Sequence, residues 1–194
     1  MTSRKPLMMT WQGVAAPYLE SVRLLVSDGR LRATGRIVAA TSQDPFHASF
    51  ELTVARGGEV GKGLLRTTTA DEERQVSVGR TQDGVWLVDH GHGTERNEFD
   101  GAKDVDVTGA VTFTSLPIRR LGLHREAGEY ELPVLQVSMP DLSVRLVRQT
   151  YRTVSVSSSG AVINYSVPGF SADLTVDPDG LVIDYPGIAS RVPR

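Results

Sequence analysis

Apolar and polar residues alternate along most of the chain, and the alternating segments end at turn-forming residues. The segment HASFELTVA (47–55) is typical, because its apolar Phe50, Leu52 and Val54 are separated by polar or charged neighbours. Successive side chains of a strand point to opposite faces, so this period of two indicates strands with one buried face. About ten or more such segments follow at near-regular spacing, and helical periodicity is nearly absent. The pattern predicts an all-β protein.

The residues between the alternating segments predict hairpins and loops. Glycine at a hairpin turn supplies the positive φ that the tight turn types require. Hairpin turns are expected at SDGR (27–30), TQDG (81–84), Pro140-Asp141, Pro168-Gly169 and DPDG (177–180). Mobile loops are expected at 57–63, 89–97 and 125–129. Hairpins joined in sequence predict one strongly curved antiparallel sheet, packed as a sandwich, roll or incomplete barrel.

One segment, TSLPIRRLGL (114–123), interrupts the strand pattern. Ser115 is a good helix N-cap, Pro117 suits a first helical turn, and Gly122 suits the position just past a helix end. We therefore predict one helical turn over 116–121. If this segment is instead a strand, its two adjacent arginines point to opposite faces.

The composition limits the classes of function. A chain of 194 residues without a linker, an internal repeat or a low-complexity tract is expected to form one domain over 1–194. The net charge of −2 and the lack of a basic run argue against a nucleic-acid partner. The absence of cysteine excludes disulfides, thiol catalysis and cysteine zinc sites. No apolar run resembles a signal peptide or a membrane span, so we expect a cytoplasmic protein.

Two carboxylates stand out against their apolar surroundings. Asp104 and Asp106 in DVDV share one face if the segment is a strand. They could form a site for a cation or for sugar hydroxyls. They could equally lie in water, or form ion pairs with Arg119 or Arg120, which are stabilising when hydrogen bonds offset the desolvation of the charges. The sequence leaves these alternatives open.

Other candidate chemistry is weaker. His90 and His92 have a spacing that could share a metal ion, but no third ligand follows nearby, so a surface loop is the simpler interpretation and no metal is expected. The serines of TVSVSSSG (153–160) lack a nucleophile-elbow motif, and GGEVGKG (57–63) lacks the phosphate-loop spacing. No cofactor is predicted, and the chain is more simply a binding protein than an enzyme.

Several motifs follow one another along the chain. One is the C-terminal Gly-Leu-Val-x-Asp-Tyr-Pro, matched by Gly180, Leu181, Val182, Asp184, Tyr185 and Pro186. Another is Asp-x-Asp followed by Leu-Pro-Ile-Arg-Arg-Leu, matched by Asp104, Asp106 and Leu116–Leu121. A third is matched by Pro140, Leu142, Gln149 and Tyr151. In this order the motifs resemble a family of bacterial glycolipid-binding proteins, and the resemblance spans nearly the whole chain. Val111 and Thr114 replace the Pro and Asn that usually precede the arginine motif in that family.

The resemblance implies a curved antiparallel sheet similar to that of bacterial lipoprotein carriers, and binding of a glycolipid. Our leading hypothesis is a lipid or glycolipid-like amphiphile bound in a cavity of the sheet, by a monomer or a homodimer. The predicted ligand-binding residues are Asp104, Asp106, Arg119, Arg120, Trp86, Gln149, Tyr151, Asp184 and Tyr185. Two alternatives are a non-catalytic domain with a filled core and a buried Asp/Arg network, and a hydrolase or isomerase that acts on a sugar-containing lipid.

Overall fold

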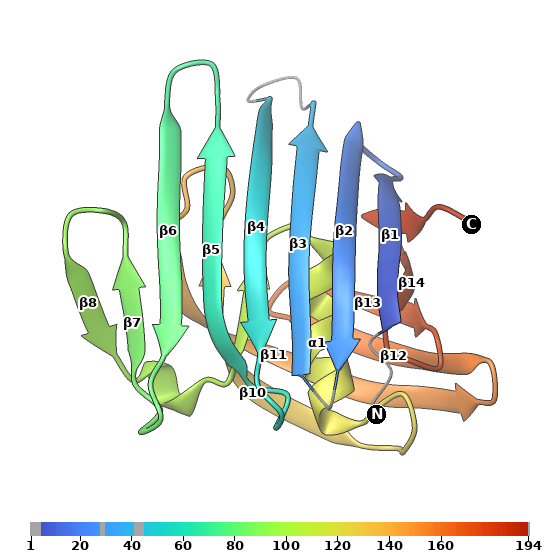
Figure 1. Ribbon diagram of the computed structural model, residues 1–194. Coiled ribbons are helices and arrows are strands. Elements are labelled where there is room, and N and C mark those ends of the chain that lie inside the picture. The colour runs from blue at the N-terminus through green and yellow to red at the C-terminus, as the bar shows by residue number, and fades with distance from the viewer. Residues whose placement is uncertain (1–4, 28–29, 41–44, 194) are drawn as a thin grey trace.

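A computed structural model describes residues 5–27, 30–40 and 45–193 of the chain. Its strands form one sheet in the order β8-β7-β6-β5-β4-β3-β2-β1-β15-β14-β13-β12-β11-β10-β9, and the two ends of the sheet do not pair with each other. Strands β1–β6 form one layer, β10–β13 curve behind it, and the helix α1 lies between them (Figure 1). The prediction of an all-β, strongly curved, unclosed sheet is confirmed.

The first half of the sheet is a continuous antiparallel meander. Its strands are β1 (Lys5–Gly13), β2 (Tyr18–Ser27), β3 (Arg30–Ala39), β4 (Phe46–Val54), β5 (Val60–Thr68), β6 (Glu73–Arg80), β7 (Trp86–Asp89) and β8 (Thr94–Asn97). The turn at TQDG joins β6 to β7 as predicted, whereas Asp28 and Gly29 lie outside the described residues. The loops predicted at 57–63 and 89–97 are shorter than expected, because β5 begins at Val60 and β8 occupies 94–97.

The second half contains the helix and the remaining strands. These are a short 3-10 turn η1 (Phe99–Gly101), β9 (Asp104–Val107), α1 (Val111–Leu121), β10 (Glu129–Val137), β11 (Val144–Ser157), β12 (Gly160–Val167), β13 (Phe170–Val176), β14 (Val182–Tyr185) and β15 (Ala189–Arg191). The turns predicted around Pro140, Pro168 and Pro178 join antiparallel neighbours. Strand β9 differs from this antiparallel pattern, because it pairs parallel to β10 at the end of the sheet.

The alternation of the sequence becomes an inner and an outer face of the sheet. In β3 every second residue is buried, from Leu31 to Ala39, and the intervening residues are exposed. The buried face packs against α1, where the rings of Phe50 and Phe113 meet edge to face with their centroids 5.0 Å apart. The ring of Phe50 lies over Gly35, where a Cβ atom would come within 2.1 Å of it. The core therefore forms between the sheet and the helix that it surrounds.

Helix α1 begins earlier than predicted. It starts at Val111 and has 11 residues, so Pro117 lies inside the helix and the predicted N-cap, Ser115, is a buried helical residue. The hydroxyl of Ser115 instead accepts a hydrogen bond from the backbone N–H of Val182, at 3.2 Å. The predicted C-terminus is correct, because Gly122 follows the helix with a φ of 70°.

The start of α1 depends on a carboxylate that is distant in the sequence. Glu20 of β2 accepts hydrogen bonds from the backbone N–H groups of Val111, at 2.6 Å, and Thr112, at 3.1 Å. It also accepts one from the Thr112 hydroxyl. The first N–H groups of a helix lack partners within the helix, and an anion there is favoured by the helix dipole. Glu20, 91 positions from Val111, thus caps the helix in place of the local N-cap that we predicted.

Candidate functional site

The two arginines at the end of α1 lie apart and have different partners. Arg120 is bound to Asp104 of β9, because its Nε lies 3.1 Å from both carboxylate oxygens and its Nη2 lies 2.5 Å from one of them. Asp104 is fully buried and Arg120 is mostly buried. The guanidinium group of Arg119 donates instead to the backbone carbonyl of Asp179. The expected ion pair with the arginine motif is therefore present for Asp104.

Asp106 shares a face with Asp104 but has a different environment. Its carboxylate accepts hydrogen bonds from the side-chain amides of Gln149, at 2.8 Å, and Gln136, at 3.2 Å. Burial raises the pKa of this carboxyl, and the two amides partly oppose the shift. An ion pair of Asp106 with either arginine, one of the alternatives above, is thus not what the structure shows.

Aromatic rings extend this polar cluster towards the surface. The hydroxyl of Tyr151 donates to Gln149 at 3.0 Å, and its ring lies 5.2 Å from that of Tyr165, centroid to centroid. The rings of Tyr185 and Phe170 lie 6.1 and 6.3 Å from that of Tyr165. Tyr151 and Gln149 are fully buried, whereas Phe170 is exposed. Four of the predicted site residues are thus gathered here: Asp106, Gln149, Tyr151 and Tyr185.

The remaining predicted site residues lie elsewhere. Trp86 of β7 is fully buried, and its indole N–H donates to the carbonyl of Ala102 at 2.9 Å. Asp184 of β14 accepts a hydrogen bond from the Ser190 hydroxyl. Among the described residues, no group of three or more His, Asp or Glu side chains could hold a metal ion.

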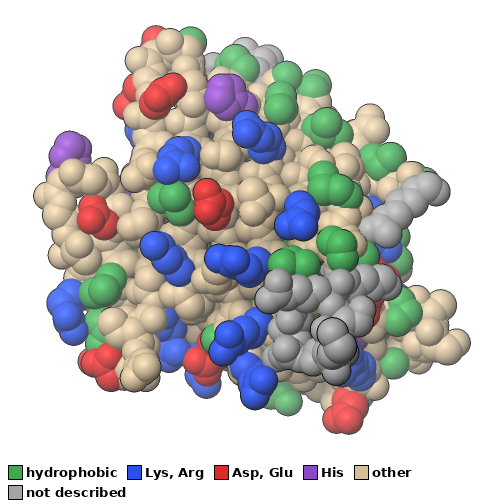
Figure 2. Space-filling model, viewed as in Figure 1, with side chains coloured by type: hydrophobic (Ala, Val, Ile, Leu, Met, Phe, Trp, Pro, Cys, Tyr) green, Lys and Arg blue, Asp and Glu red, His purple; other side chains and the backbone are tan. Residues whose placement is uncertain are grey.

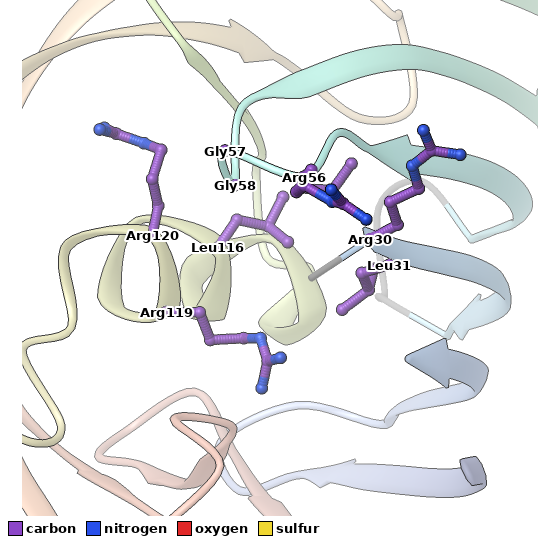
Figure 3. A pocket seen from close by; sticks show the side chains of 9 residues that line it. Arg30, Leu31, Arg56, Gly57, Gly58, Leu116, Arg119 and Arg120 are labelled. Carbon is purple, nitrogen blue, oxygen red and sulfur yellow. The ribbon is translucent and has the colours of Figure 1, made fainter. Parts of the chain in front are cut away.

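A pocket of about 220 Å³ opens where α1 meets the ends of β3 and β4. Leu31, Val54 and Leu116 provide apolar surface, and four arginines surround it. We call this site the arginine pocket, and its lining is Arg30, Leu31, Val54, Arg56, Gly57, Gly58, Leu116, Arg119 and Arg120. In Figure 3, Leu31 and Leu116 point towards the space between α1 and the strands, while the side chain of Arg30 lies on the strand side and extends away from α1.

Gly58 brings the β4–β5 turn close to the helix. Its φ of 83° lies in the left-handed region, and a Cβ atom here would lie within 3.1 Å of three carbon atoms of Arg120. Arg120 is held from the other side by Asp104. The turn therefore packs directly on the stem of Arg120 and forms one wall of the arginine pocket.

A larger hollow of about 930 Å³ adjoins the arginine pocket. It shares Arg30, Leu31, Val54, Arg56 and Gly57 with that pocket. It continues past Leu25, Arg32 and Thr53, which belong to the outer face of the sheet. The two hollows thus connect the end of α1 with the outer surface.

Sequence reasoning identified Arg119 and Arg120 but missed the strand side of this pocket. Arg30 and Arg56 are far from the arginine motif in sequence and belong to no motif that we recognised. Only the pairing of β3 with β4, and the packing of both against α1, brings them there. No local signal could have identified them.

Comparisons with known proteins place the chain in a family. A family model described as "Putative glycolipid-binding" matches residues 8–191. The crystal structure of a DUF1089 family protein from Pseudomonas aeruginosa is similar, with 26% identity, a TM-score of 0.73 and coverage of 94% of this chain and 95% of that chain. A beta-barrel-like protein of unknown function from Brucella abortus has 11% identity and a TM-score of 0.54, over 97% of this chain and 94% of that chain, and it shares the fold.

The comparison with curated proteins gave no match. Within the described part of the chain, none of the helices has the length and apolar character needed to span a bilayer.

Proposed function

The chain belongs to the family described as "Putative glycolipid-binding", and from this premise we propose that it binds an amphiphile whose anionic or sugar headgroup lies in the arginine pocket. The observation that carries the proposal is the combination of four arginines with an apolar wall in one open hollow. A guanidinium group can make paired hydrogen bonds to phosphate, carboxylate or vicinal hydroxyl groups. The wall of Leu31, Val54 and Leu116 suits the first methylenes of an acyl chain.

The dimensions of the two hollows support a headgroup site with an adjoining chain site. The arginine pocket, at about 220 Å³, is smaller than the roughly 300–1,000 Å³ of typical small-molecule sites. The adjoining hollow of about 930 Å³ adds the space that an acyl chain or a further sugar requires. Each methylene buried there would contribute about 0.8 kcal/mol. A ligand that uses both hollows would touch polar and apolar surface in turn.

The four arginines have different roles in this proposal. The guanidinium groups of Arg119 and Arg120 are already bound to Asp179 and Asp104, so they act mainly through their stems and their positive charge. Arg30 is exposed on the strand side and forms no ion pair with any described residue. We propose that Arg30 and Arg56 make the first contacts with the headgroup. Asp104 serves the site by holding Arg120 in place.

Direct ligand contact by the other predicted residues stays a prediction. Neither of the two hollows is lined by Trp86, Asp106 or Gln149, nor by Tyr151, Asp184 or Tyr185. A sugar that reached the aromatic rings beside Tyr165 would stack on Tyr185 and Phe170, whose ring centroids lie 6.3 Å apart. Substitution of Tyr185 by Leu tests that contact separately from the arginine pocket.

Calorimetric titration with dodecyl phosphate and with dodecyl maltoside tests the proposal. We expect binding of at least one amphiphile, and Arg30→Glu should weaken dodecyl phosphate binding about tenfold, which is about 1.4 kcal/mol. The matched control is Arg96→Glu on the exposed strand β8, which should bind as the wild type does. Native mass spectrometry of protein purified from cells would show whether a lipid co-purifies. If neither amphiphile binds, or if both variants lose affinity equally, the proposal is wrong.

A further inference from the structure

Exposed basic residues lie close together on the outer face of β2–β5. Antiparallel register places Arg36 beside Ser49, and Ser49 beside Arg66, in one row across the sheet. The next row contains Arg23 beside Thr34. The row after it contains Arg32 beside Thr53, and Thr53 beside Lys62. Figure 2 shows Lys and Arg side chains over the middle of this face of the molecule, with an acidic side chain among them, and α1 lies behind these strands (Figure 1). We call Arg23, Arg32, Arg36, Lys62 and Arg66 the basic face.

Among the described residues, no ion pair neutralises the basic face, although Glu51 lies within it, in the same row as Arg23 and Thr34. All five residues are exposed, and none of them forms an ion pair with a described residue. Glu51 is the one exposed carboxylate in β2–β5. The whole chain has a net charge of −2, so the charge is distributed unevenly. Such a field attracts anionic partners and orients them towards this side of the sheet.

Exposed apolar side chains border the basic face. Leu19 and Val38 are neighbours on β2 and β3, with 45% and 55% of their surfaces exposed. Met8 of β1 is 57% exposed and lies beside Arg23. Basic residues next to exposed aliphatic residues are the composition of surfaces that lie at a lipid interface.

We propose that the basic face docks on the surface of an anionic lipid bilayer. The basic residues contact lipid headgroups, and Leu19, Val38 and Met8 reach the boundary between headgroups and acyl chains. Single-stranded nucleic acids are commonly bound by stacking of bases on Phe, Tyr or Trp rings, and the exposed outward positions of β2–β5 carry none of these three residues. A soluble acidic protein would leave the aliphatic border without a role. The mixture of basic and exposed aliphatic side chains favours a bilayer.

The hollow beside the arginine pocket opens on this same face. Arg32, Leu25 and Thr53 line the hollow and belong to the outer side of β2, β3 and β4. A docked protein would therefore present the opening of the hollow near the lipid headgroups. Bilayer docking goes beyond the proposed function and does not require it, because the basic face and the arginine pocket can be tested separately.

Vesicle co-sedimentation tests the docking surface. The probes are vesicles of phosphatidylcholine alone and vesicles of phosphatidylcholine and phosphatidylserine in equal amounts, each at low and at raised salt. We expect binding to the anionic vesicles alone, weakened by salt. A basic residue at an anionic bilayer contributes about 1 kcal/mol, or about fivefold in affinity, so the variant Arg36→Gln/Arg66→Gln should bind about 25-fold more weakly. Neither residue lines the arginine pocket or the adjoining hollow.

A matched variant removes the same charge elsewhere. Arg96→Gln/Arg152→Gln changes exposed arginines on β8 and β11 and should bind anionic vesicles as the wild type does. Leu19→Ser/Val38→Ser, which keeps every charge, should weaken vesicle binding by roughly fivefold, since it removes apolar surface that enters the interface. An acidic polymer would not respond to this second variant.

Three results would overturn the docking proposal. One is equal binding to neutral and anionic vesicles, and another is an equal loss in the matched arginine variant. The third is binding of heparin or nucleic acid without binding of vesicles, which would assign the basic face to another partner. Retained affinity of Arg36→Gln/Arg66→Gln for dodecyl phosphate would show that a loss of vesicle binding does not arise from the arginine pocket. Conversely, loss of dodecyl phosphate binding in Arg30→Glu, with vesicle binding retained within about fivefold, separates the pocket from the face.

Discussion

Charged residues lie at both ends of α1, but their surroundings differ. At the N-terminus, Glu20 is fully buried and receives hydrogen bonds from Val111, Thr112 and Tyr18. At the C-terminus, Arg119 and Arg120 lie beside an open pocket with Arg30 and Arg56. The first end is closed and internally satisfied, whereas the second end borders an open hollow that is also lined by the exposed Arg30. We therefore propose a role in stability for the first end and a role in binding for the second.

Burial decides which role each end can have. Removing Glu20 from water raises the pKa of its carboxyl, and its hydrogen bonds with Thr112 and Tyr18 oppose that rise. A ligand could reach this carboxylate only by displacing those donors. The arginine pocket differs, because its hollow is already open and Arg30 is exposed. The predictions below test whether stability and binding separate as this contrast implies.

The largest effect is expected at the closed end. Glu20→Ala leaves the first N–H groups of α1 buried without an acceptor, so the free energy of unfolding should fall by about 3–5 kcal/mol. Urea unfolding followed by circular dichroism measures the change. Glu51→Ala, an exposed carboxylate on the outer face, is the control and should change stability by less than about 0.5 kcal/mol. Equal effects of the two substitutions would contradict the assigned role of Glu20.

A smaller loss is expected when the pair at the C-terminal end is broken. Arg120→Leu leaves the buried carboxylate of Asp104 without its bidentate partner, and should cost about 2–3 kcal/mol because Arg120 is not fully buried. The double variant Asp104→Leu/Arg120→Leu should regain much of this loss, because the unpaired charge is then absent. Urea unfolding of the wild type, of Arg120→Leu, of Asp104→Leu and of the double variant gives the coupling energy. A coupling near zero would show that the pair contributes no stability.

The pH dependence of stability should show that burial disfavours the charged form of Asp106. Burial raises its folded-state pKa above the unfolded value, so its contribution to stability is fully present below the unfolded pKa and is lost as the pH rises through the folded pKa. Asp106→Asn keeps an oxygen acceptor for Gln136 and Gln149 and abolishes the titration. The stability of Asp106→Asn relative to wild type should therefore increase from acidic to neutral pH. A constant difference across this range would contradict the raised pKa.

The smallest effect on stability is expected at the open end. Arg30→Ala removes an exposed side chain, and the free energy of unfolding should stay within about 0.5 kcal/mol of wild type. The same substitution should weaken binding of dodecyl phosphate, since it removes a proposed headgroup contact. Thermal unfolding and calorimetric titration of one preparation measure both quantities. A large loss of stability with unchanged affinity would reverse the roles that we assign to the two ends.

The structure bears differently on the two alternatives to ligand binding, the buried Asp/Arg network and the enzyme. The hypothesis of a buried Asp/Arg network agrees with the Asp104–Arg120 pair, and it coexists with the arginine pocket because that pair borders it. The hydrolase or isomerase hypothesis would need a cleft beside a carboxylate such as Asp104 or Asp184, and neither residue lines the arginine pocket or the adjoining hollow. Hydrolysis of a sugar-containing lipid that is lost in Asp184→Asn with the fold intact would support that hypothesis over simple binding.

Local patterns were sufficient for most of the fold. Alternation over 47–55 became β4, the turn DPDG became the β13–β14 connection, and DVDV became a strand with both aspartates on one face. Gly122 ended the helix as predicted because a left-handed residue there closes the last turn through its own backbone. In each case the determining interactions lie within a few residues of the pattern.

Local patterns predict the strands and the turns because backbone geometry and side-chain periodicity act over short distances, and the ordered motifs indicate the family. The start of α1 depends instead on a distant contact, because the acceptor for its first N–H groups is Glu20, on a strand 91 residues away. The tertiary structure likewise decided that Asp106 is bound by Gln136 and Gln149 and not by an arginine. The arginine pocket is the clearest such case, since sheet curvature gathers residues that no local pattern connects.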